Sequence, residues 1–224
     1  MKILIIEDET SIANFIKASL ESQLYIVDVA TDGEQGALLG RTGKYDLIIV
    51  DYILPQKNGL DVVKEIRRDK KTPIIMLTVY GDFDCKEKAF NLGVDDFLTK
   101  PFLLEELFLR LKALLRRPPE ITANILRVDT LMVDLNKQLV RRQGKIISLT
   151  RKEYIILEYL IRHRGEIKSR ETIMENVWDI NSDPFSNTLD THILNLRQKL
   201  KTIDGKELIH TFPGRGYKLD SKKF

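Results

Sequence analysis

The 224-residue sequence contains a single cysteine, three histidines and no long apolar run. The single cysteine, Cys85, cannot form an internal disulfide, which favours a reducing compartment such as the cytoplasm. No apolar stretch approaches the roughly 18 residues that a membrane-spanning helix requires, and the chain starts in a strand-like segment rather than in a signal peptide. The histidines and the cysteine do not cluster as metal ligands would. We therefore expect a cytoplasmic, globular protein without a membrane segment.

Four short apolar segments, rich in β-branched residues, predict buried strands of a parallel sheet. Each is followed directly by acidic, hydroxyl or amine side chains, namely Glu7 and Asp8, Asp51, Thr78, and Lys100. In a doubly wound sheet the carboxyl ends of the strands lie on one edge, where ligands bind. We therefore expect these five side chains to share one site.

Asp51 is the candidate for the reacting group of this site. Clustered carboxylates repel one another and need a cation, and hard oxygen ligands at an open edge suit Mg²⁺. The group then fits an aspartyl phosphate: Asp51 is the nucleophile, Mg²⁺ and Lys100 offset the phosphoryl charge, and Thr78 hydrogen-bonds a phosphoryl oxygen. The alternative, an acidic surface rim with a capping threonine, leaves Lys100 without a role.

Helical segments alternate with strands through the first half of the chain. Apolar periodicity predicts helices over residues 10–24, 33–41, 60–68, 82–92 and 103–116, between strands at 2–6, 26–30, 47–50, 74–77 and 97–98. Short connections between parallel strands imply right-handed crossovers, with helices on both faces of the sheet. The sequence predicts an α/β doubly wound, flavodoxin-like parallel sheet of strand order 2-1-3-4-5.

Residues 1–117 resemble the receiver domain of two-component response regulators, and the whole chain resembles the OmpR/PhoB class. The matching motifs are the acidic pair, the aspartate with a proline four residues on, the threonine, and the run Lys100-Pro101-Phe102. Two positions depart from the common pattern: Gln56-Lys57-Asn58 replaces a Gly-x-Asp found in many relatives, and Phe97 replaces the commoner tyrosine.

The resemblance implies a phosphorylation switch in this domain. A sensor histidine kinase would phosphorylate Asp51, and the protein itself would catalyse only its own phosphoryl uptake and loss. The peptide bond before Pro101 would be cis, Thr78 would move toward the phosphoryl group, and Phe97 would rotate inward. The resemblance implies that Asp8, Asp51 and the main-chain carbonyl of Ile53 bind Mg²⁺, and the acidic cluster adds Glu7 as a further candidate ligand.

The sequence Arg116-Arg117-Pro118-Pro119 ends the fifth predicted helix, and its prolines favour a semi-extended spacer. Residues 1–118 carry 17 Lys+Arg and 19 Asp+Glu, a net charge of −2, whereas residues 119–224 carry 19 and 14, a net charge of +5. A basic second domain suggests an anionic partner. We expect a receiver domain at 1–117, a linker at 118–125 and an effector domain at 126–224.

The second half predicts an α+β domain of winged helix-turn-helix type. Strand-like pieces at 126–128, 131–133, 138–142 and 146–148 precede a capping box, Thr150 with Glu153, which opens a helix. Gly165 ends that helix, and Ser169 can cap the next one. A third helix follows at 188–201, and strands at 209–212 and 217–219 form a terminal hairpin.

The third helix has one buried stripe, because its large apolar residues recur at helical spacing. Its opposite face carries side chains suited to phosphates and base edges: Thr188, Thr191, His192, Asn195, Arg197, Gln198 and Lys199. An ordinary solvated helix face is the alternative. The basic domain, the order of the helices and the glycine-flanked Arg215 favour DNA.

Residues 126–219 resemble the winged-helix effector domain of the OmpR/PhoB class. The matching stretches are 149–154, 189–193 with 196–197, and Gly214-Arg215-Gly216-Tyr217; Asn187, Asn195 and Pro213 depart from common residues. The resemblance implies that helix 188–200 enters the major groove of double-stranded DNA and that the 213–216 wing reaches the minor groove. The implied DNA contacts are Thr188, Thr191, His192, Asn195, Arg197, Lys199 and Arg215.

The resemblance also implies that the phosphorylated protein forms a homodimer about a two-fold axis. The intersubunit ion pairs would join Lys86 to Glu106, and Asp95 or Asp96 to Arg110. A further pair of the family would involve position 91, where Asn91 has no charge. The alternative is a solvated charged surface, whose pairs contribute only ~0–1 kcal/mol each.

We interpret the chain as a phosphorylation-activated, DNA-binding transcriptional regulator of a two-component system. Its expected partners are a cognate sensor histidine kinase, double-stranded DNA and a second copy of itself, with RNA polymerase as a further candidate and no membrane. One competing hypothesis is a Mg²⁺-dependent hydrolase of the haloacid dehalogenase type, but such an enzyme needs a second Asp where this chain has Ile53. The other is a DNA binder that acts without phosphorylation, which no feature of the sequence favours.

Overall fold

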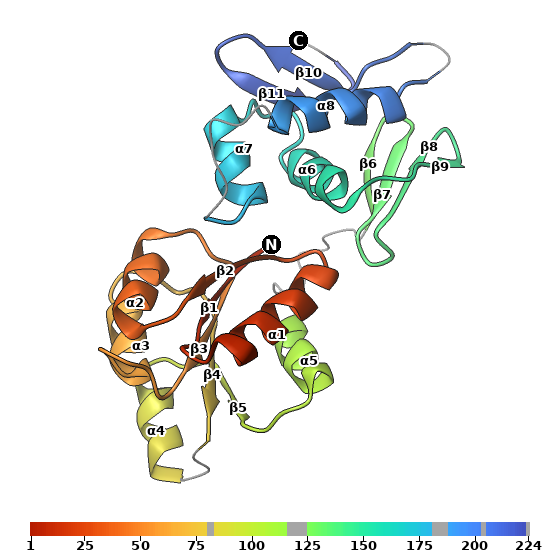
Figure 1. Ribbon diagram of the computed structural model, residues 1–224. Helices are drawn as coiled ribbons and strands as arrows, with labels where there is room; N and C mark the ends of the chain where they lie inside the picture. The colour runs from red at the N-terminus through yellow and green to blue at the C-terminus, as the bar shows by residue number, and fades with distance from the viewer. Residues whose placement is uncertain (80–82, 116–124, 181–187, 203–204, 223–224) are drawn as a thin grey trace. The chain divides into compact units, whose positions relative to one another are not determined.

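A computed structural model of the chain describes residues 1–79, 83–115, 125–180, 188–202 and 205–222, with side chains of the fourth helix described from Glu87 onward (Figure 1). The chain forms two compact units, Met1–Pro118 and Pro119–Phe224. None of the described helices is long and apolar enough to cross a membrane. Most of the predicted linker, 118–125, lies outside the described residues.

The first unit alternates five strands with five helices, as the sequence predicted. Its strands form one parallel sheet of order β2-β1-β3-β4-β5, which confirms the predicted topology. The element boundaries agree with the predicted ones to within two residues. They are β1 Lys2–Ile6, α1 Thr10–Ser22, β2 Ile26–Ala30, α2 Gly33–Thr42, β3 Leu47–Asp51, α3 Gly59–Arg67, β4 Ile74–Thr78, α4 Phe83–Asn91, β5 Asp96–Thr99 and α5 Leu104–Leu114.

Both faces of this sheet are buried. Successive strand residues point to opposite faces, so Leu4 and Ile48 join one core cluster while Ile3 and Ile49 join the other. The first cluster includes residues of α2, α3 and α4, and the second includes residues of α1 and α5. Figure 1 shows the two groups of helices on opposite sides of the sheet. The acidic and hydroxyl side chains Glu7, Asp8, Asp51 and Thr78 lie at the carboxyl ends of the strands, which is where the candidate site lies.

The second unit combines a four-stranded antiparallel sheet, three helices and a β-hairpin. The predicted capping box is confirmed, since the Thr150 side chain accepts from the backbone of Glu153 and the Glu153 side chain accepts from the backbone of Thr150. The Ser169 cap is confirmed as well. The elements are β6 Ile125–Val128, β7 Leu131–Asp134, β8 Leu139–Arg142, β9 Lys145–Ile146, α6 Arg151–Arg162, α7 Arg170–Val177, α8 Thr188–Lys199, β10 Ile209–Phe212 and β11 Gly216–Leu219.

A buried carboxylate ties α8 to the start of α6. Glu153 is only 2% exposed, and its Oε2 accepts from the backbone N–H of Thr150 and from the ammonium of Lys199, both at 2.7 Å. Burial by itself would raise the pKa of Glu153, but the hydrogen bonds from Lys199 and Thr150 outweigh it and lower the pKa. The ionised carboxylate is therefore the stable form at neutral pH, and it depends on Lys199.

We predict that Lys199→Met lowers the free energy of unfolding of the second unit by ~1–3 kcal/mol at neutral pH, because a buried acceptor loses a partner. Denaturant unfolding followed by the fluorescence of Trp178, the only tryptophan, measures it. Since the folded-state pKa of Glu153 is lowered, the contribution of the pair is present above the ordinary carboxyl range and is lost as pH falls through the lowered pKa. The difference between Lys199→Met and the parent should shrink accordingly in acid.

Lys201→Met is the matched control, because Lys201 is exposed and carries the same charge two residues on. Equal midpoints for Lys199→Met, Lys201→Met and the parent at neutral pH would contradict a stabilising role for the pair.

Candidate functional site

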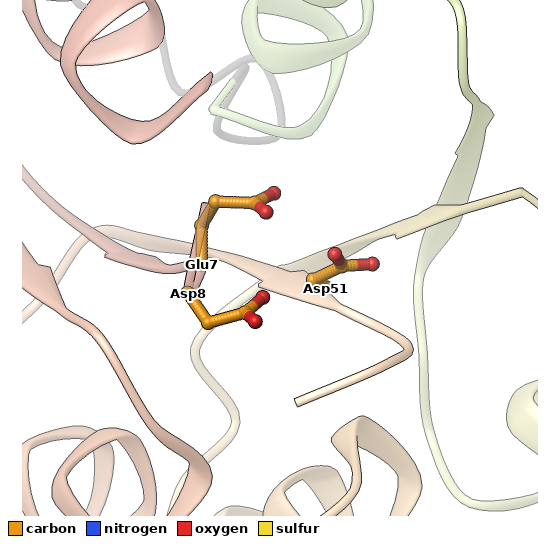
Figure 2. A group of neighbouring side chains, drawn as sticks. All are labelled: Glu7, Asp8 and Asp51. Carbon is orange, nitrogen blue, oxygen red and sulfur yellow. The ribbon is translucent and has the colours of Figure 1, made fainter. Parts of the chain in front are cut away.

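Three carboxylates meet at the carboxyl edge of the parallel sheet. Glu7 and Asp8 follow β1, and Asp51 ends β3; the pairing of Ile6 with Val50 sets the two strand ends side by side. One carboxylate oxygen from each of the three residues lies within 4.8 Å of the others. Figure 2 shows the three side chains close together at the neighbouring strand ends. The cluster that the sequence predicted is thus formed.

Lys100 bridges two of these carboxylates. Its Nζ donates to Asp51 Oδ2 at 2.7 Å and to Glu7 Oε2 at 2.8 Å. The peptide bond between Lys100 and Pro101 is cis, and the Lys100 backbone N–H donates to the Thr78 carbonyl at 2.8 Å. Burial acts to lower the pKa of Lys100, but the two carboxylates outweigh it and raise the pKa. The bridging ammonium therefore stays charged.

Glu7 has the least ordinary electrostatic environment in the cluster. Its side chain is fully buried, and this burial, together with the charge of Asp51, raises its pKa to about 7 even though Lys100 donates a hydrogen bond to it. Ionising it therefore requires more compensating positive charge than Lys100 alone supplies.

The donor set fits a hard divalent cation. Carboxylate oxygens are the ligands that Mg²⁺ prefers, and the ion keeps several of its waters when protein ligands are few. Asp8 is exposed, whereas Asp51 is 7% exposed, so the cluster is open on one side and closed on the other. The site can hold a cation that remains partly hydrated. Ile53, predicted to offer its carbonyl, is 50% exposed just beyond β3.

The predicted switch residues lie on the next two strands. Thr78 ends β4 and is 3% exposed, so its hydroxyl is at the same edge as Asp51. Phe97 in β5 is partly buried, and its ring packs edge-on against Phe90 of α4, with centroids 4.8 Å apart. The structure thus gives Phe97 an aromatic contact that the sequence alone did not indicate.

The charges predicted to pair between subunits are paired within the chain in this structure. Arg110 donates to Asp96 at 2.9 Å and to Glu106 at 2.7 Å. Asp95 accepts from Arg67 at 2.7 Å and from the backbone of Ile74. The Lys86 side chain lies outside the described residues. Arg67 escaped the sequence analysis because it lies 28 positions from Asp95 and on a different element.

In the second unit, all three charged residues of α8 have partners on other elements. Asp190 accepts from Arg170 of α7 and from the Tyr217 hydroxyl of β11. Arg197 donates to the Ile209 carbonyl at 2.9 Å and to the Thr211 hydroxyl at 2.7 Å, and Lys199 pairs with Glu153. Arg197 and Lys199 were predicted as DNA contacts. In the structure their hydrogen bonds connect α8 to β10 and α6.

The remaining predicted DNA contacts differ in exposure. Thr188 and Thr191 are exposed, Asn195 is half-buried, and Arg215 is exposed in the turn between β10 and β11. His192 packs its ring against Trp178, with centroids 6.0 Å apart, and its Nδ1 is buried without a hydrogen-bond partner among the described residues. Burial lowers the pKa of His192, which favours the neutral imidazole at neutral pH. Asn187 lies outside the described residues.

Comparisons with known proteins agree with this geometry. The family model "Response regulator receiver domain" matches residues 3–112, and "Transcriptional regulatory protein, C terminal" matches residues 143–219. Transcriptional regulatory protein CusR of Escherichia coli K12 is 41% identical over 222 residues, which covers 98% of each chain. Response regulator ArlR of Staphylococcus aureus Mu50 is 39% identical over 216 residues, or 96% of this chain and 98% of ArlR.

Among solved structures, a two-component response regulator from Clostridium difficile is 35% identical and has a TM-score of 0.51, covering 52% of this chain and 97% of that one. The receiver match contains the acidic cluster and Lys100, and the C-terminal match contains α8 and the terminal hairpin. The chain therefore belongs to the OmpR/PhoB class of response regulators, the DNA-binding transcriptional regulators of two-component systems.

Proposed function

We propose that Asp51 is the phosphoacceptor through which a sensor histidine kinase switches this regulator. The observation that carries the proposal is the placement of Asp51 at a strand end, beside two further carboxylates and 2.7 Å from the Lys100 ammonium. An Asp51 oxygen attacks phosphorus, the bond from phosphorus to the kinase imidazole breaks, and the phosphoryl group is left on the carboxylate. Mg²⁺ held by Glu7, Asp8, Asp51 and the Ile53 carbonyl would offset the charge of the transferring group.

Lys100 and Thr78 form new hydrogen bonds when Asp51 is phosphorylated. The phosphoryl group adds negative charge, so the Lys100 ammonium, which now bridges Glu7 and Asp51, moves its hydrogen bond onto a phosphoryl oxygen. Thr78 donates its hydroxyl to another phosphoryl oxygen, and Phe97 on the neighbouring strand changes its packing against Phe90. The receiver thus catalyses only its own phosphoryl uptake and loss.

The proposal assigns the receiver to residues 1–117, the linker to 118–125 and the DNA-binding effector to 126–224. It places the protein in the cytoplasm, where a kinase, DNA and RNA polymerase are all available. A hydrolase acting on other substrates is disfavoured by the half-exposed Ile53 at the position where such an enzyme carries a second aspartate.

We predict that Asp51→Asn abolishes phosphoryl incorporation from acetyl phosphate and Mg²⁺, because the amide is not a nucleophile at this position. Intact-protein mass spectrometry should show a single phosphoryl adduct on the parent and none on the variant. Asp61→Asn is the matched control, since Asp61 is an exposed aspartate in the first turn of α3. A stoichiometric adduct on Asp51→Asn, or an adduct on the parent that persists undiminished when Mg²⁺ is chelated, would contradict the assignment.

We also propose that phosphorylation drives dimerisation through the face formed by α4, β5 and α5. This face carries Asp96, Glu106 and Arg110, which form a cluster within one chain in this structure. A dimer would exchange these internal pairs for intersubunit pairs, Lys86 to Glu106 and Asp95 or Asp96 to Arg110. Because the exchange replaces pairs with pairs, its net free energy is small, and the shape change at Phe97 can decide which set forms.

We predict that Lys86→Glu blocks phosphorylation-induced dimerisation and that adding Glu106→Lys in the same chain restores it, because a two-fold interface repeats each pair twice. Sedimentation velocity of the phosphorylated proteins measures this, with Glu106→Lys alone as the second single reversal. If either single reversal dimerises as well as the parent, these two residues do not face each other across the interface.

For the second unit, we propose that α8 enters the major groove and that the β10–β11 turn reaches the neighbouring minor groove. Thr188, Thr191, His192 and Asn195 supply neutral groups on the helix. Arg197 and the 38%-exposed Lys199 side chain have N–H donors beyond those used inside the domain, which suits them to phosphate oxygens rather than to bases. Arg215, exposed in the turn, is the cation of the wing.

We predict that Arg215→Ala weakens binding to the preferred site and to unrelated DNA by about the same factor, and that it lowers the slope of log affinity against log salt by ~1. Fluorescence anisotropy at several salt concentrations measures both quantities. Lys137→Ala is the control, because it removes the same charge from the exposed turn between β7 and β8. If Arg215→Ala leaves both the affinity and the salt slope unchanged, the β10–β11 turn does not contact DNA.

A further inference from the structure

The exposed face of α8 carries a leucine at its centre. Leu194 is 54% exposed, whereas Leu189, Ile193 and Leu196 on the same helix are buried. Among the described residues of α6, α7 and α8, Leu194 is the only large apolar side chain that is exposed. Isolated exposed leucines are common on protein surfaces. This one is distinguished by its place on the helix that we propose enters the major groove.

The exposed residues one turn from Leu194 are neutral, whereas its two charged neighbours at helical spacing, Asp190 and Arg197, are half-buried and bonded to other elements. Thr191 and Gln198 lie one turn away in either direction and are exposed, and Asn195 is adjacent and half-buried. The helix therefore presents a stripe of hydroxyl, methyl and amide groups, in which Leu194 occupies the middle.

The cations of α8 are committed elsewhere, and this limits what the helix can recognise. Guanine is read in the major groove mainly by arginine or lysine. Arg197 donates to the Ile209 carbonyl and the Thr211 hydroxyl of β10, and Lys199 donates to the buried Glu153. These contacts fix the two side chains toward β10 and α6 and leave each only its spare N–H donors, which suit phosphate oxygens, so we assign base reading by α8 to its neutral side chains.

Neutral side chains in the major groove favour A·T pairs. The amides of asparagine and glutamine pair with adenine, and an apolar side chain contacts the 5-methyl group of thymine, the only methyl group in that groove. We propose that Leu194 packs against a thymine 5-methyl group and thereby selects an A·T pair at the centre of each half-site. This inference rests on the proposed function, namely that α8 is the reading helix.

The experiment removes the methyl group without changing any hydrogen bond. After the preferred DNA site is selected from random duplexes, each thymine is replaced in turn by deoxyuridine, and the affinity of the parent and of Leu194→Ala is measured by anisotropy. Burial of one methyl group is worth roughly a 4-fold change in affinity. The parent should lose about that factor at one thymine position per half-site, and Leu194→Ala should bind both versions of that site equally.

Because Leu194 is exposed, we expect Leu194→Ala to leave the unfolding midpoint of the second unit unchanged. The deoxyuridine scan of the parent protein tests the inference even without this variant. The inference is overturned if the parent tolerates deoxyuridine at every position. It is also overturned if Leu194→Ala keeps the parent's sensitivity at the same position.

Asn195→Ala separates this inference from the proposed function. If Asn195→Ala weakens binding to the preferred site while no thymine couples to Leu194, α8 reads DNA and only the leucine contact is wrong. If Asn195→Ala, Thr191→Ala and Leu194→Ala all bind as the parent does, α8 is not the reading helix, and both proposals fail together.

Discussion

The Lys100 ammonium between Asp51 and Glu7 is the interaction on which the receiver half depends. Three carboxylates within 4.8 Å of one another cannot all remain ionised without compensating charge. A single lysine at 2.7 and 2.8 Å pairs with two of them, while burial and the charge of Asp51 raise the pKa of Glu7 to about 7. The oxygen ligands of this site suit a divalent cation, and under the proposed function its charge balance would change when Asp51 is phosphorylated.

The sheet makes this arrangement possible because the apolar residues of its central strands are packed on both faces. The strands β1, β3 and β4 are covered on both faces, so a polar side chain within them would lose its hydrogen bonds to water. The reactive side chains therefore lie at or just beyond the carboxyl ends of these strands. The parallel register then sets Glu7 beside Asp51, and Thr78 one strand further on. The same register connects the site to Phe97, whose contact with Phe90 leads to α4.

In the second unit, the main long-range contacts hold α8 in a fixed position. Charged side chains near both ends of α8 are bound to other elements: Asp190 to α7 and β11, Arg197 to β10, and Lys199 to Glu153 of α6. As a result, most of the charged groups of α8 are engaged in holding the helix against the rest of the domain. Under the proposed function, the neutral side chains around Leu194 are the ones left to contact bases, so the fixed position of the helix would influence which base pair it selects.

Three features were determined by local sequence pattern. Apolar runs and helical periodicity gave the order of strands and helices, because burial on one face or two imposes those patterns directly. The residues that follow the strands, Asp51 and Lys100 among them, identified the candidate site, because parallel strands must end on one edge. The capping box at Thr150 could be predicted from the sequence because both of its hydrogen bonds join residues three positions apart.

What the tertiary structure decided is which of the long-range charges pair. Glu153 and Lys199 are 46 positions apart, and Arg170 and Asp190 are 20 apart, so no local pattern relates them. The family resemblance implied that Arg110 pairs with Asp95 or Asp96 across a dimer axis, and within one chain the structure places Arg110 2.9 Å from Asp96. Partner choice depends on distances in three dimensions and on desolvation, and both exist only once the elements have packed.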